Sequence, residues 1–120
     1  MTGLTVPALL ADHHILDEFR SGVSTLDDWL LRRARPNQIA GASRVFVTCD
    51  GEKVVGYYAL ASSAIACSDA TGRMRRNMPD PIPVVVLARL AVDEAHQGRK
   101  IGRSLMRDAA MRVLAAAGEI

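Results

Sequence analysis

The sequence predicts a mixed α/β or α+β fold in which helices pack on a sheet. Three observations support this: an Asp50-Gly51 turn between two β-rich runs, a near-continuous apolar run at 84–92, and a helical period over 101–117. With the segments before the turn, the predicted element order is β α α β β β α.

Length and composition describe one domain, residues 1–120. The chain has 120 residues and a mass of 12.9 kDa, and its 49% apolar and 23% charged residues exclude whole-chain disorder. A net charge of +2 does not indicate a generally basic nucleic-acid-binding surface, but it leaves room for a local basic patch.

Cysteine usage and hydropathy set the expected compartment. Cys49 and Cys67 are too few for a disulfide scaffold and lack metal-ligand spacing, so we expect buried thiols, no metal and a reducing compartment. No run reaches the ~18 apolar residues of a membrane span. The N-terminus does not resemble a signal peptide, so the expected location is the cytoplasm.

Before the Asp50-Gly51 turn we expect one strand and two helices. Residues 3–10 are predicted to form a strand weakened by a proline, and Asp12 to cap a short helix through Phe19. A second helix is predicted to begin at a Ser24–Asp27 capping box and to end or kink at Pro36. Its core-facing residues are Leu26, Trp29, Leu30 and Ala34.

After the turn we expect strands, a long loop and a helix. The turn joins strands at 44–49 and 53–65. Residues 66–83 have no period, which indicates a functional loop or a short helix near 73–77. The run at 84–92, broken only by an arginine, is predicted to be a central strand buried on both faces.

The first turn of the last helix has the composition of an anion site. Unpaired N–H groups and peptide dipoles leave partial positive charge at a helix N-terminus, and glycine lets an anion approach the backbone. Cations there oppose the dipole unless an anion sits among them, so we favour a phosphate or pyrophosphate site over a solvated helix end. The residues concerned are Gly98, Arg99, Lys100, Gly102 and Arg103, in neither a GxxxxGK[ST] nor a GxGxxG pattern.

Residues 97–102, Gln-Gly-Arg-Lys-Ile-Gly, resemble the Q/R-x-x-G-x-G/A signature of the GNAT N-acetyltransferase superfamily. The resemblance implies a mostly antiparallel central sheet flanked by helices, and a loop that holds the pyrophosphate of acetyl-coenzyme A. The preceding strand would lend backbone groups to the pantetheine arm and thioester. The implied cofactor-binding residues are Leu90, Ala91, Val92, Gln97, Gly98, Arg99, Lys100, Ile101, Gly102, Arg103 and Ser104.

The resemblance extends upstream to one GNAT subgroup, the acetyltransferase toxins of bacterial type II toxin–antitoxin systems. The matching residues are Phe19, Ser21, Gly22, Leu26, Asp27, Trp29, Leu30, Ala34 and Gln38, and in the hairpin Arg44, Phe46, Val47, Val54, Val55, Gly56, Tyr57 and Tyr58. The subgroup acetylates the α-amino group of aminoacyl-tRNA, which blocks translation. This implies a ribbon-helix-helix antitoxin and a homodimer. The family domain continues into a helix with a tyrosine that protonates the leaving thiolate, so we expect this chain to be C-terminally truncated and to lack that acid.

Acetyl transfer needs a polarised thioester carbonyl and a neutral amine. The backbone N–H groups of Ala91 and Val92 are candidates for the oxyanion contact. An α-amino group with a pKa near ~8 does not need a strong base. We expect Asp93 and Glu94 to be solvated carboxylates, and we favour a surface position for His96 over one near the cofactor.

Two basic groups are candidates for contacts with tRNA phosphates or an antitoxin: Arg32, Arg33 and Arg35, and Arg73, Arg75 and Arg76. The first group equally fits a helix C-terminus, where cations favour the dipole. Two alternatives remain open at this point. One is a GNAT enzyme acting on a small amine or a protein amine, and the other is an inactive remnant that binds coenzyme A or an antitoxin.

Overall fold

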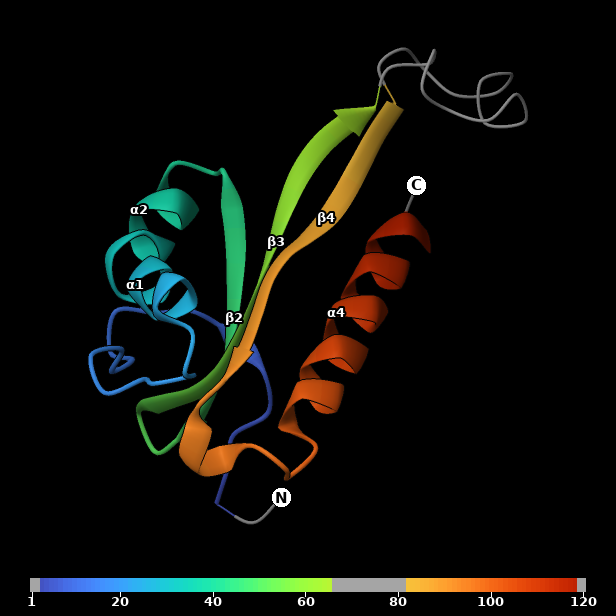
Figure 1. Ribbon diagram of the computed structural model, residues 1–120. Helices are drawn as coiled ribbons and strands as arrows, with labels where there is room; N and C mark the ends of the chain where they lie inside the picture. Colours follow the sequence, from blue (N-terminus) through green and yellow to red (C-terminus); the bar gives the residue numbers. More distant parts are fainter. Residues whose placement is uncertain (1–2, 66–81, 119–120) are drawn as a thin grey trace.

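The computed structural model describes residues 3–65 and 82–118. In chain order the elements are β1 (Ala8–Leu9), α1 (Ser24–Arg32), α2 (Ala34–Ile39), β2 (Ser43–Asp50), β3 (Lys53–Ile65), β4 (Ile82–Val92), the 3₁₀ turn η2 (Glu94–His96) and α4 (Ile101–Gly118). The sheet order is β1-β2-β3-β4, with every neighbouring pair antiparallel. α1 and α2 lie on one face of the sheet and α4 on the other (Figure 1), which confirms the predicted α+β fold.

β2 and β3 form the predicted hairpin. Asp50 pairs with Lys53 across the turn, and Gly51 between them has a φ of +66°, a conformation that glycine adopts without a steric penalty. Cys49 is buried as predicted, and burial raises the pKa of its thiol. Cys67 and the predicted helix near 73–77 lie outside the described residues.

Alternating residues of β3 supply two cores, one on each face of the sheet. Tyr57 belongs to the core under α1, where the Trp29 ring stacks on it with 6.0 Å between centroids. This contact confirms the predicted core role of Trp29. Tyr58 belongs to the core under α4, where it packs with Phe46 and Ile101.

Residues 12–19 do not form the predicted helix. Ile15 instead lies beside the start of β3, where its N–H donates to the Glu52 carbonyl and its carbonyl accepts from the Val54 N–H. The predicted strand at 3–10 is likewise reduced to the two residues of β1. The apolar side chains of the segment still reach the core through Leu16 and Phe19.

The predicted capping box at Ser24 is also wrong. The N-cap residue of α1 is Val23, which has no side-chain cap. Asp27 reaches back past it and accepts hydrogen bonds from the Ser21 N–H (3.0 Å) and hydroxyl (2.6 Å). Pro36 lies in the first turn of α2, and the helix is interrupted just before that turn, as the steric effect of proline predicts.

β4 is an edge strand of the described sheet, which corrects the prediction of a central strand buried on both faces. Val85 and Val86 are 54% and 42% exposed. A continuous apolar run shows that a strand has two apolar faces, but it does not show what covers them. Within residues 3–65 and 82–118, no helix combines the length and hydropathy that a membrane crossing requires.

Candidate functional site

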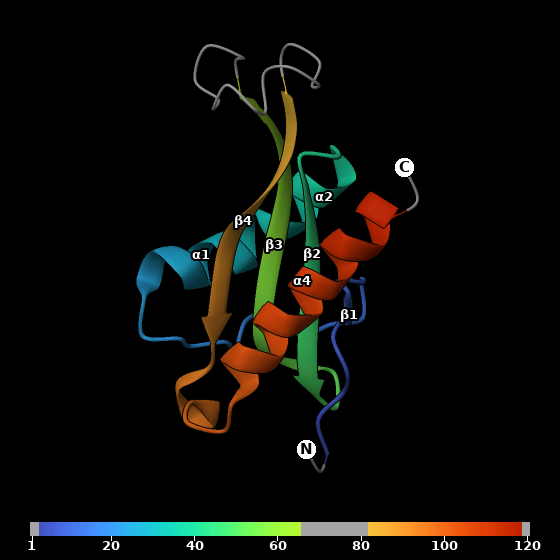
Figure 2. The same ribbon diagram turned by 90° about the vertical axis from the view of Figure 1, so that its right-hand side faces the viewer.

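The chain between η2 and α4 forms a turn at the end of β4 (Figure 2), and this turn has a row of backbone N–H groups without partners in the described chain. Gly98 and Lys100 have φ angles of +84° and +64°, with Arg99 between them outside the left-handed region. Such alternation turns successive N–H groups toward one point and forms an anion-binding nest. No acceptor in the described part of the chain is bonded to the N–H groups of residues 98–103, which we call the amide turn.

A pocket of about 380 Å³ opens over the amide turn. Its walls come from the end of β4, from η2 and from the first turn of α4: Val92, His96, Gln97, Gly98, Lys100, Ile101, Gly102 and Arg103. A Cβ at Gly102 would meet only Val92 Cγ2, at the ordinary contact distance of 3.7 Å. The packing therefore does not demand glycine there, but its bare backbone leaves room for a ligand.

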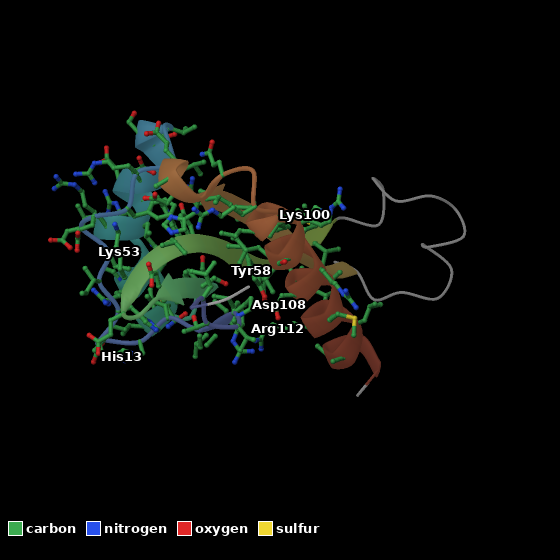
Figure 3. All side chains as sticks on the ribbon, turned by 90° about the horizontal axis from the view of Figure 1, so that it is seen from below. His13, Lys53, Tyr58, Lys100, Asp108 and Arg112 are labelled. Atoms are coloured by element: carbon green, nitrogen blue, oxygen red, sulfur yellow. The ribbon has the colours of Figure 1, made fainter. Side chains whose placement is uncertain are left out.

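Three exposed cations surround the amide turn: Arg99, Lys100 and Arg103. None of them lies within 4.0 Å of a carboxylate among the residues that the structure describes. Lys100 lies at the start of α4 in Figure 3. The turn thus combines unpaired N–H donors with uncompensated positive charge, as an anion site requires.

α4 sits close on β3, and this contact sets the position of the amide turn. A Cβ at Gly56 would stand 3.1 Å from both Ile101 Cγ2 and Leu105 Cδ1. Glycine at this strand position therefore permits the close approach of the helix. The signal in the sequence is a glycine inside an otherwise bulky strand.

Both tyrosine hydroxyls donate hydrogen bonds within the fold. The Tyr57 hydroxyl donates to the Leu26 carbonyl (2.7 Å), and the Tyr58 hydroxyl donates to Asp108 Oδ2 (2.5 Å), which also accepts from Arg112 Nε (2.8 Å; Figure 3). Burial is the main cause that raises the pKa of each phenol above its ordinary value. Neither tyrosine offers its proton to the amide turn.

Gln97 holds the amide turn in place with its side chain. Its Nε2 donates to the carbonyls of Val92 (2.9 Å) and Ser21 (3.0 Å). The side-chain amide is therefore committed to the protein, so any contact of Gln97 with a ligand in the pocket would come from its other atoms.

The free edge of β4 continues directly from the amide turn. The Asp93 N–H donates into the sheet, to β3, whereas the Val92 carbonyl accepts its hydrogen bond from outside the sheet. Because these directions alternate along a strand, Leu90 and Val92 present their backbone groups to the open edge and Ala91 faces β3. Of the two predicted oxyanion donors, only Val92 therefore directs its N–H to the open edge.

Asp93 is not the solvated carboxylate that the sequence predicts. It is 5% exposed and accepts hydrogen bonds from the Arg20 and Ala95 N–H groups, both at 3.0 Å. Burial alone would raise the pKa of this carboxyl, but the hydrogen bonds outweigh it and hold the pKa below its ordinary value. His96, predicted at the surface, has a side chain only 13% exposed, with Nδ1 3.5 Å from Asp93 Oδ1. Glu94 is exposed as predicted.

Asp93 is a structural residue of the site that sequence reasoning missed. Its side chain caps η2 and ties the end of β4 to the loop before α1. An aspartate directly after a strand and before a short helical turn is the signal that would have identified this cap.

The predicted tRNA-contact group near α2 is divided by the structure. Arg35 Nη2 donates to the carbonyls of Ala11 (3.1 Å) and His14 (2.7 Å), so this guanidinium is part of the fold, which corrects its assignment as a contact residue. Arg32 and Arg33 are exposed. The second predicted group, Arg73, Arg75 and Arg76, lies outside the described residues.

The chemistry available at the amide turn is anion binding joined to strand-edge hydrogen bonding. A ligand with a diphosphate at one end and an extended amide chain at the other would use both features. In the described ranges no cluster of three or more His, Cys, Asp or Glu side chains could hold a metal ion.

Residues 41–119, which contain the amide turn and β4, match the acetyltransferase (GNAT) domain. The chain belongs to the GNAT acetyltransferase family. A tRNA-acetylating toxin of Mycobacterium tuberculosis is 51% identical over 120 residues, a match that covers 100% of this GNAT chain and 72% of that protein.

Two solved structures of the AtaT toxin are similar to this GNAT chain. One, complexed with acetyl-methionyl-tRNAfMet, has a TM-score of 0.81 and 26% identity, covering 95% of this chain and 71% of that one. The other, a mutant toxin bound to the C-terminus of the antitoxin AtaR and acetyl-CoA, has a TM-score of 0.80 and 27% identity, covering 98% and 70%.

The GNAT signature residues form one contiguous site in the structure. Residues 97–103 line the pocket or the amide turn, and the outward groups of Leu90 and Val92 adjoin them. Ser104 differs, because its N–H already donates to the Lys100 carbonyl within the helix start, while its side chain is exposed.

Proposed function

We propose that this chain is an acetyl-coenzyme A-dependent N-acetyltransferase that acetylates the α-amino group of aminoacyl-tRNA, and so acts as a translation-blocking toxin. The observation that carries the proposal is the row of unpaired N–H groups at 98–103, among three cations and continuous with the open edge of β4. The 51% identical tRNA-acetylating toxin and the AtaT complexes support the acceptor class and the acetyl donor.

Binding of acetyl-coenzyme A would use two parts of the chain. The amide turn receives the diphosphate, where each charge–dipole contact contributes roughly 0.3–1 kcal/mol. The outward N–H of Val92, next to the amide turn, pairs with an amide of the pantetheine arm, much as an added strand pairs with a sheet edge.

The Leu90 N–H, further along the open edge from the amide turn, would then stabilise negative charge on the thioester oxygen in place of the predicted Val92 N–H. The acceptor nitrogen bonds to the carbonyl carbon, the carbon–sulfur bond breaks, and the proton lost by the amine balances the one gained by the thiol. With an α-amino pKa near ~8, a neutral fraction of the amine is present without a strong base. Alignment of the two reactants lowers the barrier by about 7–11 kcal/mol.

The partners follow from the same relationship. We propose a ribbon-helix-helix antitoxin, a homodimer, a cytoplasmic location, and a single N-acetyltransferase domain over 1–120. The structure of AtaT bound to the C-terminus of AtaR supports the antitoxin.

The test is an acetylation assay with radiolabelled acetyl-coenzyme A and tRNAs charged with one amino acid at a time. We expect label on charged tRNA, released when the aminoacyl ester is hydrolysed, and none on deacylated tRNA. Label on a small amine or a protein N-terminus but on no charged tRNA would replace the proposed acceptor.

A thermal-shift measurement tests the donor site separately. Acetyl-coenzyme A should raise the melting temperature, because a ligand that binds only the folded state stabilises it. A shift without turnover on any amine would support a non-catalytic binding protein, and no shift at millimolar ligand would overturn the donor site.

A further inference from the structure

Arg89 is the one charged residue of β4, and it is half-buried against an aromatic ring. Its guanidinium carbon lies 4.8 Å from the centroid of the Trp29 ring. Trp29 itself stacks on Tyr57 with planes 10° apart. Within residues 3–65 and 82–118, no carboxylate lies within 4.0 Å of Arg89. The ring therefore orients the guanidinium without neutralising its charge.

A bulge in β4 decides where this side chain points. Arg89 pairs with Ala59 of β3 while Leu87 pairs with Leu60, so Ala88 is an extra residue on β4. The bulge shifts the alternation of side chains by one residue. It places Leu87 in the core under α4 and Arg89 over Trp29 of α1.

Arg89 therefore shares the α1 side of β4 with Ala91, which lies in the core under α1. Residues i and i+2 of a strand are roughly 7 Å apart. The backbone of Arg89 directly precedes Leu90, where the proposed thioester would lie. The Arg89 guanidinium is on the sheet face opposite to α4.

Two other arginines of the described chain already donate hydrogen bonds within the protein. Arg35 donates to backbone carbonyls, and Arg112 donates to Asp108. The coenzyme's diphosphate is proposed to bind at the amide turn, beyond the end of β4. The charge of Arg89 is therefore left for a different anion.

We propose that Arg89, seated on Trp29, binds a backbone phosphate at the 3′ end of the acceptor RNA and so positions the aminoacyl group at the edge of β4. This inference rests on the proposed function, because it assumes an RNA acceptor. A guanidinium donates two parallel hydrogen bonds to a phosphate, which fixes register as well as charge. Arg89 acts here as a substrate-binding residue.

A fluorescence titration tests the phosphate contact without turnover. Trp29 is the single tryptophan of the chain, so its emission reports on the ring that carries Arg89. We expect unacylated CCA trinucleotide to change this emission saturably. Arg89→Gln should weaken CCA binding about 10-fold or more and reduce the slope of log affinity against log salt by about 0.7.

Arg107→Gln is the matched control, because it removes an equal charge from an exposed position on α4, a residue with no part in the proposed sites. It should leave the CCA titration and its salt slope unchanged. An Arg89→Gln titration that matches the wild type would overturn the proposal.

Kinetics with two acceptors then locate the effect. Aminoacyl-adenosine has no internucleotide phosphate, whereas aminoacyl-CCA has two. Arg89→Gln should lower kcat/KM for aminoacyl-CCA by about 10- to 100-fold, mainly through KM, and leave aminoacyl-adenosine and the KM for acetyl-coenzyme A unchanged. An equal loss on both acceptors would overturn the proposal.

The two hypotheses fail in different ways. If the wild type acetylates neither acceptor but binds CCA through Arg89, the proposed function is wrong and the phosphate site stands. Should Arg89→Gln melt below the assay temperature, Arg89→Lys replaces it. The lysine keeps the charge but loses the planar fork, so we expect a several-fold loss confined to aminoacyl-CCA, and no loss would overturn the proposal.

Discussion

Arg35 of α2 and the three basic residues at the start of α4 lie in opposite environments. Near α2, Arg35 donates to three backbone carbonyls and has become part of the fold. At the start of α4, Arg99, Lys100 and Arg103 have no ion-pair partner in the described chain and stand beside unpaired N–H groups. The hydrogen-bond acceptors within reach of a cation, rather than the local density of cations, therefore decide whether it stabilises the fold or remains free to bind a ligand.

The cause lies in the backbone of each region. Residues 12–19 are irregular, so their carbonyls need donors, and the chain near α2 supplies them. Gln38 does the same for its neighbours: its Nε2 donates to the Leu10 carbonyl (2.9 Å) and its Oε1 accepts from the Val45 N–H (2.8 Å). The amide turn has the reverse imbalance, an excess of exposed N–H donors that an anion can pair with.

The largest expected effect comes from placing an anion inside the amide turn itself. Gly102→Glu should weaken acetyl-coenzyme A binding at least ~100-fold, because the carboxylate repels the diphosphate and fills its space. The measurement is the thermal shift with acetyl-coenzyme A, which should disappear.

Gly102→Ala is the control, since its Cβ would make only an ordinary contact with Val92. It should keep the shift. An undiminished shift in Gly102→Glu would mean that the diphosphate binds elsewhere.

A stability loss of intermediate size is expected at Arg35, the residue of α2 that donates to backbone carbonyls. Arg35→Ala should lower the free energy of unfolding by about 2 kcal/mol, because half-buried carbonyls lose a charged donor. Arg32→Ala, at an exposed position, should change it by less than about 0.5 kcal/mol. Urea denaturation measures both, and equal values for the two variants would contradict the structural role of Arg35.

The smallest effect concerns Asp93, which joins the end of β4 to the loop before α1 through the Arg20 N–H. Asp93→Asn should cost about 1 kcal/mol at pH 7, because the hydrogen bonds to the Arg20 and Ala95 N–H groups lose their charge assistance.

This loss should depend on pH. The folded pKa of Asp93 lies below its ordinary value, so its stabilisation is complete above the unfolded pKa of about 3.9 and disappears as pH falls through the folded pKa. The difference in melting temperature between wild type and Asp93→Asn should be constant from pH 7 to 5 and shrink below about pH 4. A gap that stays constant into strong acid would contradict this assignment.

Local signals predicted the hairpin, the last helix and the amide turn. Asp50-Gly51 and the residues of 98–103 need only their neighbours in sequence to adopt their conformations, and the structure has both. The helix predicted at 12–19 failed because Ile15 found backbone partners in the hairpin, and a hydrogen bond to another segment outweighs a weak helical period.

The α+β class, the position of the amide turn and the family resemblance could thus be predicted from local signals, because each depends on contiguous residues. Only the tertiary structure decided that β4 lies at an edge, that Arg35 is consumed by carbonyls and that Arg89 lies on Trp29. These outcomes depend on groups far apart in the chain, which pair by distance and direction in the folded molecule and leave no periodic trace in sequence.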